Sequence, residues 1–149
     1  MTDQINSQTQ IAASPALQSL QRLVGTWDVS GSTIHGQVTY EWMEGRHFLR
    51  QNFDLVHDGR DIKGIEIIGH QREFGAEKPS EDLKAHVFDN EGNTLDYVYE
   101  VEGETLIIWG GVKGSPSYFR GTFSPDGTSL KGAWVWPGGG YDSTMSRVR

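Results

Sequence analysis

The sequence predicts an all-β protein: a single antiparallel, up-and-down β-barrel of about ten strands, preceded by one short helix. From Thr26 onward, turn signals recur at intervals of about 8 to 12 residues, which is typical of an antiparallel barrel or sandwich. The composition agrees, because 19 glycines accompany 5 Trp, 5 Tyr and 6 Phe among 149 residues. Glycine-rich turns between aromatic segments favour strands over a helical bundle.

The helix is predicted close to the N-terminus. Residues 1–13 are polar and are expected to form a flexible tail. Ser14 is a good N-cap, Pro15 suits the first helical position, and Gly25 supplies a stop signal. Together they predict one amphipathic helix over 14–24. Its apolar face consists of Leu17, Leu20, Leu23 and Val24.

The remainder, up to residue 149, is expected to belong to one barrel domain. Its predicted strands are 26–33, 36–43, 46–56, 61–70, 82–89, 94–101, 104–112, 116–124, 128–136 and 140–148. The turn candidates between them are Glu44-Gly45, Asp58-Gly59, Asn90-Glu91-Gly92, Glu102-Gly103 and Pro125-Asp126-Gly127. Closure into a barrel is favoured because it removes both sheet edges. The alternative is a sandwich, split at the long 71–81 loop.

The turns also predict which side chains share a face. Two-residue loops would pair Met43 with Arg46 and His57 with Arg60. Both registers place the same, largely apolar residues on one face, which should line the interior: Val38, Tyr40, Trp42, His47, Leu49, Gln51, Phe53, Leu55, Ile62, Glu66, Ile68 and His70. The opposite face carries Thr39, Glu41, Arg50, Asn52, Asp54 and Lys63.

The later hairpins extend this interior face. A three-residue loop at 90–92 and a two-residue loop at 102–103 would add Leu83, Ala85, Val87, Leu95, Tyr97, Tyr99, Leu106 and Ile108. The 125–127 turn favours Tyr118, Arg120 and Thr122 inside with Leu130 and Trp134, whereas a loop one residue different would place Phe119 and Phe123 there. The face of His86, Trp109, Tyr118 and Arg120 is therefore left open.

Composition limits the classes of function. The chain has no cysteine, which excludes disulfides, thiol nucleophiles and cysteine-ligated metal centres. A formal net charge of −7 argues against nucleic acids and anionic membranes as partners. No apolar run approaches the roughly 18 residues of a membrane span. The N-terminus lacks the basic and apolar regions of a secretory signal, so we expect a cytoplasmic protein. The oligomeric state stays open, a homodimer included.

Two short features suggest a family. Gly25-Thr26-Trp27 opens the first predicted strand directly after the helix, and the last strand carries Arg147 and Arg149. This pattern resembles the calycins, which include lipocalins and fatty-acid-binding proteins. In calycins the tryptophan of a Gly-x-Trp motif packs near a late basic residue at the closed end of the barrel. The resemblance implies that Trp27 is buried against the helix, close to one of these arginines.

Longer stretches give a more specific resemblance. They are Tyr-Glu-Trp-Met-Glu-Gly-Arg-His-Phe-Leu-Arg-Gln at 40–51, Gly-Ile-Glu-Ile-Ile-Gly-His at 64–70, Phe-Arg-Gly-Thr-Phe at 119–123 and Trp-Val-Trp-Pro-Gly-Gly-Gly-Tyr at 134–141. Together they resemble a bacterial family, domain of unknown function 1579, which implies a lipocalin-like barrel but no established activity or site residues. The chain more distantly resembles the haem-binding nitrobindins. No histidine follows His86 to act as an axial ligand, and we expect no cofactor.

The strongest candidate for chemistry is Glu66, which the register places opposite Gln51 on the interior wall. A buried carboxylate must be paired, hydrogen-bonded or neutral. Gln51 can donate to it, as can Tyr40 from the neighbouring strand. Glu66 is therefore a candidate general base or ligand-orienting group, and the alternative is a purely structural network.

Histidines supply two further candidate pairs. His47 is predicted opposite His70 at a barrel mouth, where the pair could act in acid–base catalysis or bind a metal. Solvated strand ends are the favoured interpretation, and no third metal ligand is predicted within reach. His86 is predicted opposite Asp96, and a surface pair is favoured over a catalytic dyad because no nucleophile lies beside it.

Aromatic side chains complete the candidate pocket. The pocket is expected between the 36–70 hairpins and the 128–145 hairpin. Its predicted ligand-binding residues are Tyr40, Trp42, His47, Gln51, Tyr97, Tyr99, Trp134 and Trp136, and its candidate catalytic residues are Glu66 and His70. Three functions follow: binding of a small hydrophobic or aromatic molecule, which is favoured; cofactor-independent isomerase, cyclase or lyase activity through Glu66 or a barrel histidine; and a filled structural barrel.

Overall fold

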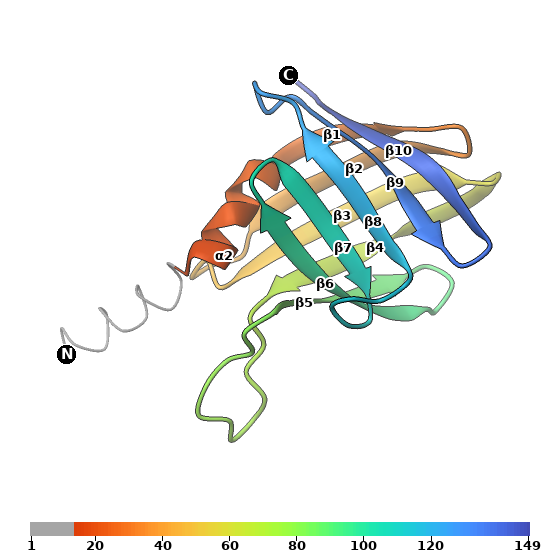
Figure 1. Cartoon of the computed structure of the whole chain (residues 1–149). Coiled ribbons are helices and arrows are strands. Elements are labelled where there is room, and N and C mark those ends of the chain that lie inside the picture. Colours follow the sequence, from red (N-terminus) through yellow and green to blue (C-terminus); the bar gives the residue numbers. More distant parts are fainter. Residues whose placement is uncertain (1–13) are drawn as a thin grey trace.

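The structure, a computed structural model that describes residues 14–149, is dominated by antiparallel strands. They are β1 (Gly25–Ser30), β2 (Ile34–Trp42), β3 (Phe48–His57), β4 (Arg60–Gly69), β5 (Leu83–Asp89), β6 (Thr94–Glu102), β7 (Thr105–Gly110), β8 (Tyr118–Phe123), β9 (Ser129–Trp136) and β10 (Gly139–Arg147). Each strand pairs with the next, and β1 pairs with β10 to close the barrel (Figure 1). The ten-strand barrel prediction is confirmed. The predicted tail, 1–13, lies outside the described residues.

The sandwich alternative is wrong. It required the sheet to split at the long loop between β4 and β5. Instead β4 pairs with β5 across this loop, from Gly64 opposite Asp89 to Gly69 opposite Lys84. Figure 1 shows the loop extending away from the barrel while the two strands remain side by side. The interior is therefore enclosed by one continuous sheet.

The helix closes one end of the barrel (Figure 1). It begins as α2 (Pro15–Ser19) and tightens into a 3-10 turn, η1 (Leu20–Leu23). Ser14 caps it as predicted, because its Oγ accepts a hydrogen bond of 3.1 Å from the backbone N–H of Leu17. The predicted apolar leucines at 17, 20 and 23 are all buried in the core.

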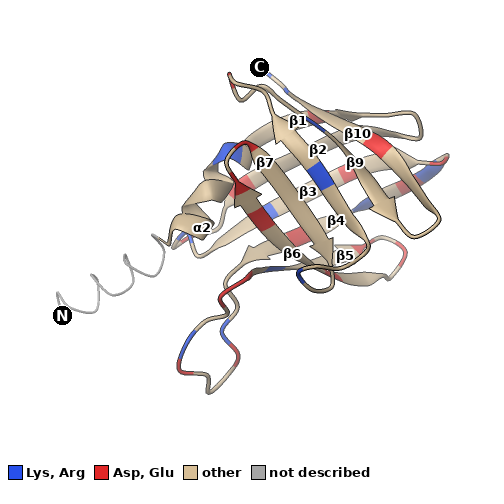
Figure 2. Cartoon of the chain, viewed as in Figure 1, with Lys and Arg blue, Asp and Glu red and all other residues tan. Residues whose placement is uncertain are grey.

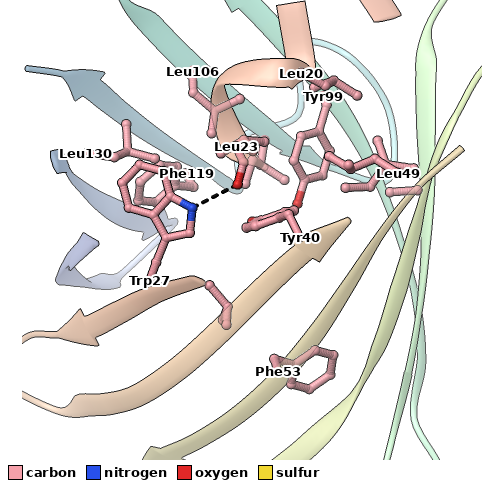
Figure 3. Packing of buried hydrophobic residues seen from close by; sticks show 14 of the residues in the cluster. Leu20, Leu23, Trp27, Tyr40, Leu49, Phe53, Tyr99, Leu106, Phe119 and Leu130 are labelled. Carbon is pink, nitrogen blue, oxygen red and sulfur yellow. Dashed lines mark hydrogen bonds between the residues drawn. The ribbon is translucent and has the colours of Figure 1, made fainter. Parts of the chain in front are cut away.

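Trp27 anchors this closed end, as the calycin resemblance implies. It is fully buried, and its Nε1 donates a 2.8 Å hydrogen bond to the carbonyl of Leu23 (Figure 3). The guanidinium of Arg147, its pairing partner on β10, lies 4.2 Å from the indole centroid. Arg147 also donates to the carbonyls of Val24 (2.6 Å) and Arg22 (2.8 Å). One arginine thus joins the helix to the seam between the first and last strands.

The predicted registers are correct in two hairpins and shifted by two residues in two others. His57 lies opposite Arg60, and His86 lies opposite Asp96, as expected. Trp42 pairs with Leu49 rather than His47, because Gly45 and the following arginine both adopt positive φ in a longer loop. The β6–β7 loop likewise falls one residue later than expected. Side chains alternate with a period of two, so these shifts leave the predicted faces unchanged.

The β8–β9 hairpin corrects the favoured interior face. Its loop has four residues rather than three, since Ser124 donates its backbone N–H to the carbonyl of Ser129 (2.9 Å). Asp126 stabilises the longer turn by accepting hydrogen bonds from the main chain and hydroxyl of Thr128. A shift of one residue reverses the faces. The interior residues are therefore Phe119 and Phe123, which are buried, while Tyr118, Arg120 and Thr122 lie on the outer face.

Candidate functional site

The barrel interior is only partly filled and holds a cavity of about 390 Å³. The helix and its leucines cover one end, whereas His57 at the end of β3 and residues of the β5–β6 turn line the other. Exposed residues such as Glu91 and Asn93 mark this second end as the mouth. The wall comprises Val29, Ile34, Val38, Tyr40, Gln51, Phe53, Leu55, His57, Ile62, Glu66, Val87, Leu95, Tyr97, Tyr99, Leu106, Ile108, Phe119, Leu130, Trp134, Tyr141, Ser143 and Met145, with Asp89, Glu91 and Asn93 at the mouth.

A small polar cluster lies inside this apolar wall. Glu66 is only 4% exposed, and its Oε1 accepts a 2.6 Å hydrogen bond from the hydroxyl of Tyr99. On the adjacent strands, Gln51 donates from Nε2 to the hydroxyl oxygen of Tyr40 at 2.6 Å. Figure 3 shows the side chains of Tyr40 and Tyr99 lying close together. Four strands thus contribute one polar residue each to a single cluster.

Burial controls the proton affinity of this cluster. Removal from water raises the pKa of Glu66 to about 7, and the hydrogen bond from Tyr99 only partly opposes this effect. Burial and the nearby Glu66 charge raise the pKa of Tyr97 to about 12. The same two causes raise the pKa values of Tyr40 and Tyr99 further. At neutral pH the tyrosines are uncharged, and Glu66 is poised between its two protonation states.

Aromatic rings form one side of the cavity. Trp134 lies between Phe119 and Tyr97, with ring centroids 5.5 and 5.7 Å away and tilted geometry. Nearer the mouth, the rings of His57 and Tyr141 lie 4.4 Å apart. Such walls contribute large apolar contact areas and favour flat ligands.

Charge in the cavity is one-sided. Among residues 14–149, the lining contains the carboxylates of Glu66, Asp89 and Glu91 but no lysine or arginine. Asp89 is held by the side chain and backbone of Asn93, which lower its pKa. Arg60 pairs with Glu91 at the rim and is itself largely exposed. Figure 2 shows that the remaining acidic and basic residues are interspersed along the strands and loops.

The structure brings together six of the ten predicted site residues. Those that line the cavity are Tyr40, Gln51, Glu66, Tyr97, Tyr99 and Trp134. Trp42 lies at the closed end, where its Nε1 donates to the side chain of Gln21 (2.7 Å). Trp136 is 44% exposed and packs edge-on against Tyr141 at the rim. These two tryptophans are therefore not part of the cavity wall.

The predicted histidine pair at a barrel mouth is also corrected. The β3–β4 ladder ends at Phe48 opposite Gly69, before His47 and His70 can pair, and this end of the barrel is the one closed by the helix. His70 is a structural residue, because Ser14 lies 2.9 Å from its Nε2 and the Ser80 carbonyl 2.8 Å from its Nδ1. It ties the helix to the β4–β5 loop.

The other histidine pair lies on the outer face. His86 Nδ1 contacts Asp96 Oδ1 at 2.5 Å, with the two side chains 45% and 67% exposed. The favoured surface interpretation of this pair is confirmed. Trp109 and Tyr118, whose face the sequence left open, pack against each other at 5.3 Å across the β7–β8 pairing.

Several cavity residues were not placed on the interior face by the sequence analysis, among them His57, Tyr141 and Ser143. His57 could have been predicted from the sequence, because it continues the alternation of Phe53 and Leu55 on the interior face to the end of β3. Tyr141 and Ser143 belong to the β9–β10 hairpin, where Tyr141 lies opposite Trp134, and the sequence analysis assigned no register to that hairpin.

Other possible sites are limited. Within residues 14–149, no group of three or more histidine, aspartate or glutamate side chains is arranged to hold a metal ion. None of the helices in this range has the length and apolar character needed to cross a membrane. No known family model matches the chain, and no curated protein matches it either.

Proposed function

We propose that the chain binds a small, largely apolar or aromatic molecule inside the barrel. The observation that carries this proposal is the unfilled interior, since a purely structural barrel would be expected to pack its core to near-crystalline density. The cavity volume lies within the range of about 300–1,000 Å³ common for small-molecule sites. Its aromatic wall would contribute about 25 cal/mol per Å² of apolar ligand surface buried. The Glu66 cluster would fix the orientation of a polar group.

A cofactor-independent enzyme is the second candidate function. It is favoured by the burial of Glu66 inside the cavity, which raises its pKa to about 7. General bases work best when their pKa lies near the operating pH. In this alternative, Glu66 would remove a proton from one carbon of an enclosed substrate and return it to another, as an isomerase does. Binding ranks first because the whole apolar and aromatic cavity supports it, whereas catalysis rests on one titratable group.

The family assignment and location remain part of the proposal. A lipocalin-like member of the domain-of-unknown-function-1579 family would have this barrel, with Trp27 and Arg147 at its closed end. A cytoplasmic location fits the acidic, cysteine-free composition.

Filling the cavity tests the proposal. Ser143 is buried and faces the cavity, so Ser143→Phe would place a ring in the ligand space. Ser146→Phe is the matched control, because Ser146 is exposed on the same strand. The probe is N-phenyl-1-naphthylamine, an uncharged dye whose fluorescence rises in apolar surroundings. We expect saturable binding to the wild type and the control, and at least tenfold weaker binding to Ser143→Phe. Equal binding by all three proteins, or by none, would overturn the proposal.

A further inference from the structure

We propose that the ligand is an amine, bound as its ammonium form, with the charged group against Glu66 and the apolar part against the aromatic wall. This inference rests on the proposed binding function and names its ligand class. It starts from the position of Glu66, which lies deep in the cavity rather than at its mouth. Ile62 and Glu66 both face the cavity from β4, four residues apart, so the carboxylate lies roughly 13 Å further along the strand.

Glu66 is under-supplied with partners. A carboxylate can accept about four hydrogen bonds, and Tyr99 is the one described side chain that donates to it. Glu66 lines the cavity, so the remaining acceptor positions of its carboxylate are available to a ligand there. No cation of the described residues lines the same space. A ligand ammonium, with three N–H donors, would provide both the missing charge and the missing hydrogen bonds.

The surroundings discriminate between ligand charges. A carboxylate or phosphate ligand would meet Glu66 inside and Asp89 at the mouth, where Glu91 is already paired with Arg60, and no lysine or arginine of the described residues lines the cavity. A neutral ligand would leave the ionised carboxylate unpaired and desolvated. An ammonium is attracted by Glu66 and Asp89, and the faces of Tyr97 and Trp134 suit a cation.

Binding should therefore depend on pH through Glu66. The titratable groups that face it are Tyr40, Tyr97 and Tyr99, all uncharged below pH 9 because their pKa values are raised. Farther out, the cavity is lined by His57, Tyr141, Asp89 and Glu91. An ammonium favours the ionised form of Glu66, whose pKa is about 7. If only that form binds, affinity should rise about 30-fold between pH 5.5 and pH 8.

Three ligands that share one phenylpropyl skeleton separate the possibilities. They are 3-phenylpropylamine, 3-phenylpropanol and 3-phenylpropionate, each titrated against protein loaded with N-phenyl-1-naphthylamine. The amine stays protonated from pH 5.5 to pH 8, as a lysine side chain does. At pH 8 we expect the Kd of the amine, measured by displacement of the dye, to be at least tenfold lower than the Kd of the alcohol. The reason is that a hydrogen bond to a charged group is stronger than a hydrogen bond between neutral groups. The carboxylate should bind weakest.

Two variants assign the effect to Glu66. In Glu66→Gln, the amine should bind no more tightly than the alcohol and should lose the Glu66-dependent rise with pH, while alcohol binding is retained. Glu41→Gln is the matched control, because it removes the same charge from an exposed site on the outer face of β2 and should behave as the wild type.

The outcomes distinguish the two proposals. Tight dye binding, with the alcohol or the carboxylate bound as well as the amine, would overturn the amine assignment and leave the proposed function standing. Retention of amine preference in Glu66→Gln would also overturn it. Absence of dye and ligand binding altogether would overturn the proposed function itself. The pH dependence of the wild type provides an independent test should Glu66→Gln fold poorly.

Discussion

Replacing Glu66 with glutamine measures how much burial of this carboxylate lowers the free energy of unfolding. In the unfolded chain the pKa of Glu66 is its ordinary 4.5, and in the barrel it is about 7. Below pH 4.5 both states hold the proton, so burial carries no ionisation penalty. Between the two values the unfolded chain releases the proton while the folded chain retains it. The wild type should therefore lose stability as the pH rises from about 4.5 to about 7, and the loss should then level off.

The magnitude follows from the two pKa values. Their difference, about 2.5 pH units, corresponds to about 3 kcal/mol at 1.36 kcal/mol per unit. Glutamine keeps the shape and the oxygen that accepts from Tyr99, and it cannot ionise. Glu66→Gln should therefore match the wild type near pH 4 and exceed it by about 3 kcal/mol at pH 8.

Urea unfolding, followed by tryptophan fluorescence at half-unit steps from pH 4 to pH 8.5, measures this difference. Histidines and surface carboxylates titrate in both proteins, so only the difference between the two curves is interpreted. Glu41→Gln serves as the control for net charge and should show no such pH-dependent difference. A constant offset between Glu66→Gln and the wild type at every pH would refute the reasoning, because it would mean that folding leaves the pKa of Glu66 unchanged.

Two further predictions concern the closed end and the corrected hairpin. Trp27→Ala should lower the free energy of unfolding by about 3–5 kcal/mol, as truncations of large buried aromatic residues do. The substitution removes a fully buried ring and the stacking partner of Arg147. A loss below about 1 kcal/mol in urea unfolding would contradict the packing described. Phe119→Ala should lower it by a similar 3–5 kcal/mol, whereas Arg120→Ala, one residue along β8 and exposed, should change it by no more than about 0.5 kcal/mol. The reverse order in thermal denaturation would indicate that the faces of this strand are assigned wrongly.

Much of the cavity wall could be predicted because a register error of two residues leaves every side chain on the same face of the sheet. The β2–β3 loop is longer than expected, yet Tyr40, Gln51 and Glu66 still lie inside together. The β8–β9 loop is one residue longer than predicted. This difference places Phe119 on the interior face, where the sequence had favoured Tyr118 and Arg120. The hydrogen bonds that lengthen this turn come from Asp126 and depend on its three-dimensional geometry.

The location of the cavity along the barrel axis was harder to predict. Alternation shows which face a residue occupies, and it does not show at which end of the barrel the space lies. Trp42 and His70 share the interior face with Glu66, but they lie against the helix and its adjoining loop. The filling of this end depends on how the leucines of the helix pack, which is a tertiary property.

The pairing of β1 with β10 affects how the chain can fold while it is being synthesised. Every other strand pair joins neighbours in the chain and can form soon after it leaves the ribosome. The pairing of Trp27 with Arg147 can form only after a further 120 residues have been synthesised. At typical bacterial or eukaryotic synthesis rates that interval is roughly 6–24 s. During this time β1 and the newest strand are free edges, which can pair with the edges of other nascent chains on the same messenger RNA. Closure of the seam therefore sets the period in which newly made protein is most prone to aggregate.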